Sequence, residues 1–376
     1  MLYKALDNKS IEYQGNKINK KQLITIDSVE KDLLSERVNR IKNEKMFYHL
    51  NQIDNGIFNA SVLYFNNINA NWANLPLTTR MISSPGEVYA WQNLDYTTDA
   101  LPVELPNWFG GKERIFLAES SQFYLELNLL INWLDKVYSI YNSFRKEESD
   151  ATHLSEFQHI EFEWKINNEE NIEIFMELFD YVFNYLIKNN LKDLQFFLTE
   201  EQIKEKTRLV KNGPIRIAFR DALDILYKET NEEKYKEFSL KHFGTWEEVK
   251  LTEILWANII VEEFPMLQIP FYHAIADKDV DWVPVAKNAD LILNGYRETI
   301  WAGERIKDKD VLLKKAEIFN LPKEDYLPYL KSRDYDDYEI TSGFGLWWQR
   351  LVQWVTNQPY IYESTVFPRT HLTPNP

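Results

Sequence analysis

Residues 144–164 constrain the fold of this chain more than any other stretch, because polar and apolar side chains alternate along their second half. A period of two is typical of a strand whose two faces meet different environments. Residues 137–141 are also strand-like, and a polar turn separates the two runs. The pattern therefore predicts an antiparallel hairpin. One face of its second strand would carry Phe157, His159, Glu161 and Glu163, and the other Gln158, Ile160, Phe162 and Trp164.

The charged groups of this hairpin allow two interpretations. Arg145 and several carboxylates, among them Glu161 and Glu163, would lie near one face of the sheet. Ionised side chains are costly to bury unless they are paired or bind a ligand. The hairpin is therefore either a solvated surface element or part of a binding site.

Composition narrows the class of protein. The 376 residues suffice for one large or two modest domains, and the net charge of −15 disfavours nucleic acid as a partner. Cysteine is absent, which excludes disulfides and thiolate nucleophiles. The sequence has no glycine-rich phosphate loop, no apolar run long enough for a membrane span and no signal-peptide pattern at MLYKALDNKS. We therefore expect a cytoplasmic protein in which side chains bind any nucleotide.

Helical and strand-like segments are mixed along the chain. Apolar spacing predicts helices over residues 28–51, 120–133, 168–190, 199–211, 220–228, 246–263 and 343–358, with two further pieces around Pro322. Strands are expected over residues 114–117, 215–219 and 287–293, between Pro265 and Pro270, and in a small hairpin at residues 13–16. Residues 57–83 are expected to be extended and residues 84–112 to form a long loop. The predicted fold class is α+β.

Five segments resemble the class II aminoacyl-tRNA synthetases of the asparaginyl and aspartyl subgroup. The hairpin is similar to motif 2 of that subgroup. Its residues run in the order Phe-Arg-x-Glu, a short loop, His-Leu-x-Glu-Phe and Glu-x-Glu. Residues 343–351 and 366–370 look like motif 3 and the terminal FPR segment. The other matches are residues 290–305, which resemble the segment with an acid pair and a substrate-binding arginine, residues 120–126, and more weakly residues 214–226.

The resemblance implies an antiparallel β-sheet flanked by helices and a catalytic domain over residues 57–376, with a short N-terminal extension over residues 1–56. The subgroup normally begins with a β-barrel that reads the anticodon, and the first 56 residues lack the five regular strands of such a barrel. The chain is similar in this respect to stand-alone paralogues such as archaeal-type asparagine synthetases.

The resemblance also assigns nucleotide binding to a few side chains. Arg145 and Arg350 would be the catalytic residues, because a guanidinium offers a planar fork of donors to phosphate and carboxylate groups. Phe157 and Arg350 would hold the adenine of ATP between them. Glu147 would bind the adenine or the α-amino group, and His153 would contact the outer phosphates.

Asp290 and Glu298 would hold Mg²⁺ against the phosphates, because carboxylate oxygens are hard ligands. Catalysis would then consist of charge stabilisation at the transferring phosphorus. Without the resemblance, both residues would be interpreted as ordinary acids in a chain that has 58 of them.

The amino-acid substrate would be bound by Ser120, Gln122, Glu126 and Arg305. Aspartyl members place a lysine where this chain has Leu125, whereas asparaginyl members have a neutral residue followed by glutamate. This chain has Glu126 after the neutral Leu125, and an acid there favours a substrate whose side chain ends in an amide NH₂ donor. The resemblance therefore implies asparagine or a related polar amino acid.

Several positions depart from the subgroup pattern. The motif 2 loop is one residue short and has Thr152 where an arginine is usual. Bulky or uncharged side chains replace other expected residues at Trp301, Ala302, Trp347, Gln349 and Tyr362. Glycine allows a ligand to approach the backbone closely, and tryptophan fills that space. Two exchanges of glycine for tryptophan would therefore reshape the pocket.

Three functions follow as hypotheses. The first is ATP-dependent activation of asparagine or a similar amino acid as an aminoacyl-adenylate, with transfer to a small acceptor. The second is a truncated asparaginyl-tRNA synthetase that charges tRNA, and the third a catalytically degenerate paralogue that acts as a ligand-binding or regulatory protein. The first implies ATP and Mg²⁺ as cofactors, a homodimer by family analogy, and neither tRNA nor membrane as a partner.

Overall fold

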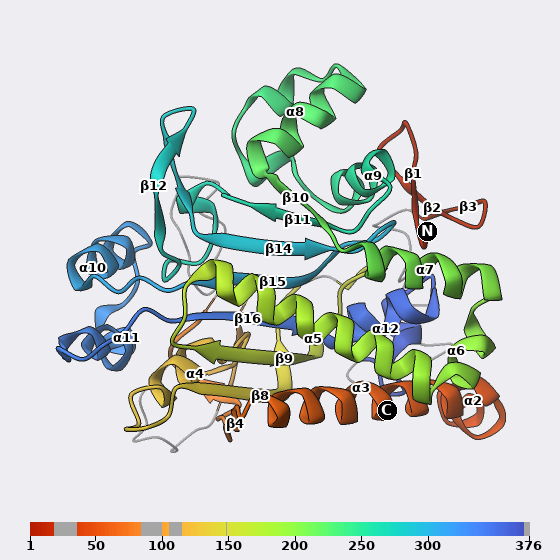
Figure 1. Cartoon of the computed structure of the whole chain (residues 1–376), viewed down its shortest axis with the longest axis horizontal. Helices are drawn as coiled ribbons and strands as arrows, with labels where there is room; N and C mark the ends of the chain where they lie inside the picture. The colour runs from red at the N-terminus through yellow and green to blue at the C-terminus, as the bar shows by residue number, and fades with distance from the viewer. Residues whose placement is uncertain (19–35, 84–99, 105–114, 148, 372–376) are drawn as a thin grey trace.

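The computed structural model describes residues 1–18, 36–83, 100–104, 115–147 and 149–371. Its centre is an eight-stranded sheet in the order β10-β11-β14-β15-β16-β9-β8-β4 (Figure 1). These strands are β10 (Ile215–Ala218), β11 (Ile259–Glu262), β14 (Asn288–Ile292), β15 (Glu298–Glu304), β16 (Ser342–Trp347), β9 (Glu156–Trp164), β8 (Lys136–Phe144) and β4 (Asn71–Trp72). Neighbours pair antiparallel except β10 with β11 and β4 with β8, which are parallel.

β8 and β9 form the hairpin that the sequence predicts. They pair antiparallel from Lys136 opposite Trp164 to Phe144 opposite Glu156. β16 pairs with the other edge of β9, so β9 lies inside the sheet. Because residues 159–163 are all buried, the hairpin is a central element of the fold and not a solvated surface element.

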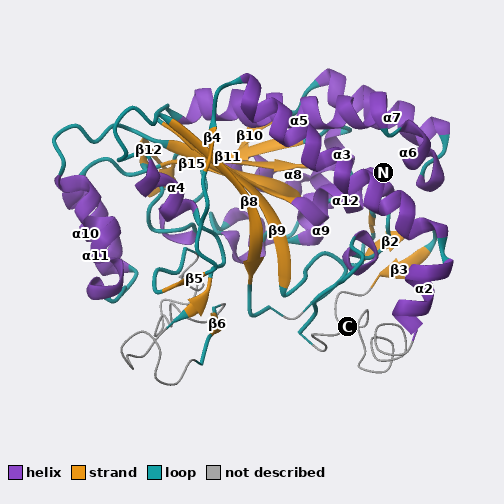
Figure 2. Ribbon diagram, turned by 90° about the horizontal axis from the view of Figure 1, so that it is seen from below, coloured by secondary structure: helices purple, strands orange, loops and turns teal. Residues whose placement is uncertain are grey.

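Helices cover one face of the sheet. α3 (Lys45–Asn67), α5 (Asn168–Asn189) and α12 (Trp348–Thr356) lie on the same side of it in Figure 2. α5 contacts β15 and β16, and α12 contacts β9. Phe65 of α3 stacks on Tyr138 of β8 at 4.2 Å between ring centroids. This face of the sheet therefore carries the main hydrophobic core.

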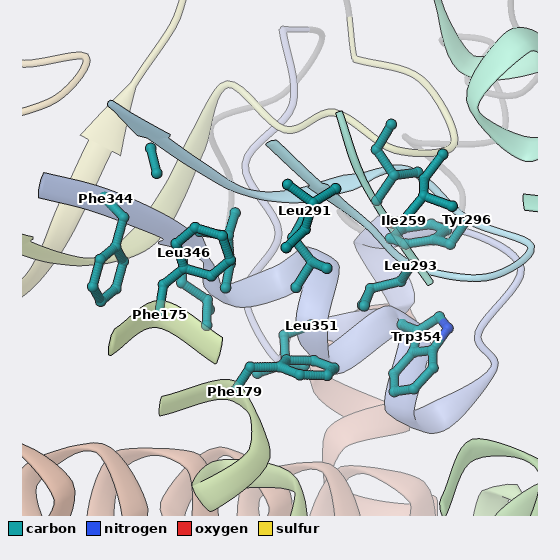
Figure 3. Close-up of a cluster of buried hydrophobic side chains, with 14 of the residues drawn as sticks. Phe175, Phe179, Ile259, Leu291, Leu293, Tyr296, Phe344, Leu346, Leu351 and Trp354 are labelled. Carbon is teal, nitrogen blue, oxygen red and sulfur yellow. The ribbon is translucent and has the colours of Figure 1, made fainter. Parts of the chain in front are cut away.

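The core beneath α5 and α12 is shown in Figure 3. Phe344 and Leu346 project from β16 toward Phe175 of α5, and Leu351 and Trp354 of α12 lie in the same cluster. Each such side chain contributes about 1.5–3 kcal/mol by its removal from water. Since side chains of a strand alternate, Gly343, Gly345 and Trp347 of β16 point to the opposite face.

α5 matches its sequence prediction closely. Asn167 accepts a hydrogen bond from the backbone N–H of Glu170, whose side chain accepts one from the N–H of Asn167. This capping box satisfies two backbone donors that the first turn leaves without helical partners. The buried stripe Ile172, Phe175, Leu178, Val182 and Leu186 recurs at helical spacing and faces the sheet.

The remaining elements surround this core. The smaller sheets contain β1 (Lys4–Ala5), β2 (Ile11–Tyr13) and β3 (Asn16–Ile18), then β5 (Thr78–Thr79), β7 (Phe116–Leu117) and β6 (Leu101–Pro102), and finally β12 (Ile275–Val280) and β13 (Val283–Ala286). The other helices are α2 (Arg37–Asn43), α4 (Gln122–Asn128), α6 (Leu191–Phe197), α7 (Glu200–Asn212), α8 (Phe219–Thr230), α9 (Thr245–Leu255), α10 (Lys309–Ile318) and α11 (Lys323–Leu330). The α+β class and the small hairpin at residues 13–16 are thereby confirmed.

Four predicted elements are wrong. Residues 57–67 are not extended, because α3 continues to Asn67 with its buried residues at helical spacing. The helix over 246–263 ends at Leu255, and β-branched residues 259–261 begin a strand. Residues 342–347 form β16 before α12 starts, and residues 266–268 form a 3₁₀ turn instead of a strand. The helix expected at 120–133 is shorter, spanning Gln122–Asn128.

Other predictions are only partly testable. The beginning of the helix at 28–51, most of the loop at 84–112 and Arg114 lie outside the described residues. α3 runs across residue 56, so one helix joins the predicted extension to the predicted catalytic domain. In the described part of the chain, no helix is both long enough and apolar enough to cross a membrane.

A partly buried carboxyl between α3 and α12 gives the fold a pH dependence. Asp54 accepts a hydrogen bond of 2.7 Å from Nε1 of Trp348, and burial raises its pKa to about 7. Because this pKa lies above the unfolded value, the protonated group stabilises the fold below about pH 4, and this contribution is lost as pH rises through about 7. Its size is at most about 4 kcal/mol.

Asp54→Asn should therefore flatten the fall in unfolding free energy between pH 5 and pH 8, because asparagine keeps an acceptor for Trp348 and does not ionise. Urea denaturation at both pH values measures this. An identical pH dependence in wild type and variant would contradict the prediction.

Candidate active site

The sheet face opposite the helices gathers side chains from five neighbouring strands. Ser139 of β8 pairs with Glu161 of β9, which pairs with Gly345 of β16. Gly345 pairs with Trp301 of β15, and Trp301 with Asp290 of β14. Since directly paired residues share a face, these five residues form one row across the sheet. The pairing register of these strands therefore brings residues 161, 290 and 301 to the same face of the sheet.

Two glycines of β16 allow close packing on this face. A Cβ atom at Gly343 would lie 1.9 Å from Oε2 of Glu163, and one at Gly345 would lie 2.0 Å from the ring of Trp301. Both contacts are too short for any side chain. The carboxylate and the indole thus take the space above β16 that the missing side chains leave.

Gly343→Ala is expected to destabilise the fold by about 3 kcal/mol, because the new methyl group would overlap Glu163 and the backbone oxygen of Phe162. Gly244→Ala is the matched control, since the nearest atom to its Cβ lies 3.9 Å away. Thermal and urea denaturation of both variants provide the comparison. Equal stability of the two would show that Glu163 moves aside without cost.

Arg305 and Glu163 form a fully buried ion pair in the part of the site predicted for the amino acid. The Nε and Nη2 atoms of Arg305 donate to the two carboxylate oxygens of Glu163 at 2.9 and 2.8 Å. Tyr272 places its ring 5.2 Å from the guanidinium. Burial raises the pKa of Glu163 even though Arg305 opposes that shift. The arginine is therefore held by the sheet before any ligand binds.

Ser120 and Gln122 stand beside this pair at the start of α4. Ser120 donates its hydroxyl to Glu161 at 2.6 Å, and burial raises the pKa of that carboxyl to about 7. Oε1 of Gln122 accepts a hydrogen bond of 3.3 Å from Tyr272. Within the described residues, the buried Nε2 of Gln122 has no hydrogen-bond partner, so a donor is left in the substrate part of the site.

Glu126 has a different environment from the other predicted substrate residues. It accepts a hydrogen bond of 2.7 Å from Tyr329, is bonded by Tyr338 and pairs with Arg333. These partners belong to α11 and the segment that follows it. Glu126 is thus engaged by this chain's own donors and does not line the cavity described below.

Asp150 and His153 of the motif 2 loop are held by a largely buried chain of contacts. Nδ1 of His153 lies 2.8 Å from Asp150, and its Nε2 lies 2.8 Å from Nη1 of Arg297. Burial lowers the pKa of His153, which fits a neutral ring that donates to Asp150 and accepts from Arg297. Arg297 also donates to Glu248 at 2.9 Å. Both nitrogens of His153 are therefore engaged, whereas a contact with phosphates was expected.

Arg297 and Glu248 were missed by sequence reasoning. Arg297 directly precedes Glu298, and a second cation next to a predicted ligand could have signalled its role. Glu248 lies on α9, far from every motif in the sequence. No local signal could have found it.

The residues predicted to bind adenine contact an indole of the chain. The ring of Trp347 lies 4.5 Å from that of Phe157, with 30° between the planes. The guanidinium of Arg350 lies 4.2 Å from the centroid of Trp347, and that of Arg145 lies 4.7 Å from it. Nε1 of Trp347 donates to Glu298 at 3.0 Å. The space beside Phe157 and Arg350 that was predicted to take adenine, called the adenine slot below, is thus filled by a side chain of the chain itself.

Other bulky residues complete this filling. Trp347, Phe157, Leu154 and Ile361 form one buried apolar cluster. Trp301 and Tyr362, two of the residues that depart from the subgroup pattern, pack against it. Three of the departures noted in the sequence, Trp301, Trp347 and Tyr362, therefore meet in the nucleotide part of the site.

Asp290, Glu298 and Glu248 lie near one another beside this cluster. Burial and the charges of the other two raise the pKa of Asp290. Arg350 lies 3.8 Å from Oε1 of Glu298. Across the residues with described positions, no group of three or more His, Asp or Glu side chains is arranged to hold a metal ion. Mg²⁺ usually takes only one or two carboxylates and completes its coordination with water and phosphates, so the residue types of Asp290 and Glu298 suit it, whereas Trp347 occupies the space of the adenine base.

A cavity of about 260 Å³ remains between the two parts of the site. Ser120, Arg145, Asp290 and Glu298 line it, together with Trp301 and Trp347 and the residues Tyr272, His273, Glu248 and Arg297. Ligand pockets typically measure about 300–1,000 Å³, so this cavity suits a small ligand. The structure therefore brings four predicted site residues to one cavity and places Gln122 and Arg305 against its wall through Tyr272.

Comparison with known proteins identifies the family. The sequence model for tRNA synthetases class II (D, K and N) matches residues 97–371. The chain belongs to this class II aminoacyl-tRNA synthetase family, whose members are ligases.

Among individual relatives, the asparagine–tRNA ligase of Pelotomaculum thermopropionicum is 31% identical over 260 residues, which cover 68% of this chain and 57% of the relative. That of Thermococcus kodakarensis is 32% identical over 262 residues, with the same coverage of 68% and 57%. The chain thus spans less than two thirds of the length of these relatives.

The fold is also that of solved synthetases. The structure of asparaginyl-tRNA synthetase from Pyrococcus horikoshii in complex with asparaginyl-adenylate superposes with a TM-score of 0.78 at 23% identity, over 98% of this chain and 79% of that one. The enzyme from Entamoeba histolytica gives a TM-score of 0.75 at 21% identity, over 96% of this chain and 74% of that one. The predicted class II synthetase-like fold is confirmed.

Proposed function

We propose that this protein activates asparagine or a closely similar polar amino acid with ATP, forming an aminoacyl-adenylate, and transfers the acyl group to a small acceptor. The buried pair of Arg305 and Glu163 carries the proposal. It holds a guanidinium and a carboxylate in fixed positions next to Gln122 and Tyr272. A guanidinium can donate to a side-chain carbonyl while a carboxylate accepts from an amide, so the pair suits a carboxamide.

The similarity to asparagine–tRNA ligases supports the choice of substrate. Ser120, Gln122, Glu126 and Arg305 remain the proposed amino-acid-binding residues, with Glu126 acting through Arg333 and the tyrosines it contacts. Arg145 lines the cavity together with Ser120 and is the proposed ligand of the reacting carboxylate and α-phosphate.

The proposed ATP site consists of Arg145, Glu147, His153, Phe157 and Arg350, with Asp290 and Glu298 as Mg²⁺ ligands. Arg145 contacts Glu147 at 3.7 Å, and Arg350 donates to the backbone oxygen of Glu298 at 2.8 Å. In ATP use, His153 is proposed to act by positioning Arg297. Adenine would need the slot that Trp347 fills, so the nucleotide requires a rearrangement there.

The acceptor is proposed to be a small amine or ammonia instead of tRNA. The net charge of −15 supports this, because an acidic protein repels a polyanion. A homodimer, as is usual for class II cores, is part of the same proposal.

Amino-acid-dependent exchange of pyrophosphate into ATP tests the function. A panel of amino acids should give exchange with asparagine or a near analogue and little with leucine or lysine. If no amino acid supports exchange and ATP does not bind to the wild type or to a variant lacking the Trp347 indole, the proposal is wrong. A shift of total tRNA at low salt would favour the tRNA-charging alternative.

A second candidate is a ligand-binding protein that recognises the amino acid without activating it. The indole in the adenine slot favours it specifically. Asparagine binding in calorimetry, without exchange in any variant, would decide for this candidate.

A further inference from the structure

The side chain of Trp347 contacts the residues that were predicted to bind the adenine base of ATP. Trp347 is 6% exposed, and its indole contacts an aromatic ring, that of Phe157, and two guanidinium groups, those of Arg145 and Arg350. Its only polar atom, Nε1, donates to Glu298 at 3.0 Å. The family resemblance assigned all of these partners to nucleotide or Mg²⁺ binding. The indole therefore engages at one time the groups that would otherwise contact ATP and its metal ion.

Indole and adenine compete for such a slot because they share the relevant properties. Both are flat, fused, electron-rich rings that stack on a phenyl group and attract a cation over their face. A base that stacked on Phe157 would meet the indole that already lies against this ring. Neighbouring aromatic side chains also pack against the indole of Trp347 and hold it in this position. The ring centroid of Trp301 lies 5.7 Å from that of Trp347, and the ring centroid of His159 lies 4.7 Å from it.

The backbone does not force this arrangement. Trp347 has φ −76° and ψ 107°, an ordinary extended conformation, at the junction where β16 ends and α12 begins. A residue of any type can adopt these angles. The indole is therefore held by its side-chain contacts, and a smaller residue would open the slot without changing the course of the chain.

We propose, on the basis of the ATP-dependent function above, that Trp347 is an internal competitor of the nucleotide base and sets the affinity for ATP. The base gains the slot only when the indole leaves it. The same movement releases Glu298 from Nε1 and makes its carboxylate available to a cation. Nucleotide affinity in the wild type thus comes from the phosphates, and the base adds little to it.

Calorimetric titration without amino acid tests this directly, with ATP and inorganic tripolyphosphate as the two probes. Wild type should bind both probes with similar, weak affinity. Trp347→Gly should bind ATP at least ten times more tightly than wild type and prefer it to tripolyphosphate, and Trp347→Phe should be intermediate. Trp282→Gly is the matched control, because this tryptophan is 95% exposed at a φ of 65°, which suits glycine.

The outcomes separate this inference from the proposed function. ATP affinity that is equal in wild type, Trp347→Phe and Trp347→Gly overturns the competition, whatever pyrophosphate exchange shows. Wild type that already binds ATP much more tightly than tripolyphosphate overturns it as well, even if Trp347→Gly does not fold. Tighter ATP binding in the variants supports the competition, and the absence of exchange would then count against the activation chemistry alone.

Discussion

Arg305→Met is expected to destabilise the folded chain by about 3–5 kcal/mol, because it leaves the carboxylate of Glu163 buried without its partner. Both side chains of this pair are fully buried, and two hydrogen bonds of 2.9 and 2.8 Å join them. Water is not expected to replace the lost interaction, since neither side chain is exposed to solvent. Urea denaturation followed by circular dichroism measures the effect.

Two further variants make this result interpretable. Arg305→Met combined with Glu163→Leu should recover most of the stability, because removing both charges avoids an unpaired buried group. This double variant should fold but not bind asparagine, which separates the role in the fold from the proposed role in recognition. Arg216→Met removes a half-exposed arginine that pairs with Glu169 and Glu262 and should cost less than about 1 kcal/mol. A single variant at Arg305 as stable as Arg216→Met would contradict the expectation.

Periodicity predicted the elements whose environment repeats along the chain. β9 has one buried apolar face and one polar face, and α5 carries a continuous apolar stripe, so both have a clear period. β16 was predicted as a helix because its two faces do not differ in polarity. Phe344 and Leu346 pack in the core, while glycines 343 and 345 accommodate side chains from the neighbouring strands. That reason lies in the packing of three strands and not in the local sequence.

In the candidate site, too, the sequence predicted some features and not others. The resemblance to the synthetase family was sufficient to name Arg145, Ser120, Asp290 and Glu298, which line one cavity. The resemblance could not show which way each side chain points, or which groups of the chain already contact it. His153 faces Arg297 instead of an open phosphate site, because Asp150 and Arg297 hold both of its nitrogens. A contact between residues 144 positions apart has no local signature.

The departures from the subgroup pattern were visible in the sequence, but their joint effect was not. Trp301 and Trp347 are 46 positions apart in the chain, and each could have been an isolated substitution. The register of β15 with β16 places both on the site face, where they pack with Phe157 and Tyr362. The structure thus converts two separate exchanges into one filled slot, which explains why nucleotide affinity should depend on Trp347.

Arg145→Ala should reduce amino-acid-dependent pyrophosphate exchange about a hundred- to a thousandfold, the usual loss when a preorganised charge at the reacting phosphorus is removed. Arg145 begins the loop directly after β8, and its backbone N–H donates to the oxygen of Ser155 at 3.0 Å. The backbone of Arg145 is therefore anchored at the edge of the cavity, and its side chain starts from a defined position. Burial would raise the pKa of Glu147, yet the surrounding cations, Arg145 among them, lower it.

The exchange assay should be run in the wild-type and Trp347→Gly backgrounds, so that a filled adenine slot does not hide the effect. Arg145→Lys keeps the charge but loses the planar fork, and we expect it to recover only part of the activity. Arg216→Ala is the control for loss of a surface arginine and should leave exchange unchanged. Equal exchange in Arg145→Ala and Arg216→Ala would mean that the reacting phosphate is bound elsewhere, because a residue at the α-phosphate cannot be removed without lowering the rate of that step.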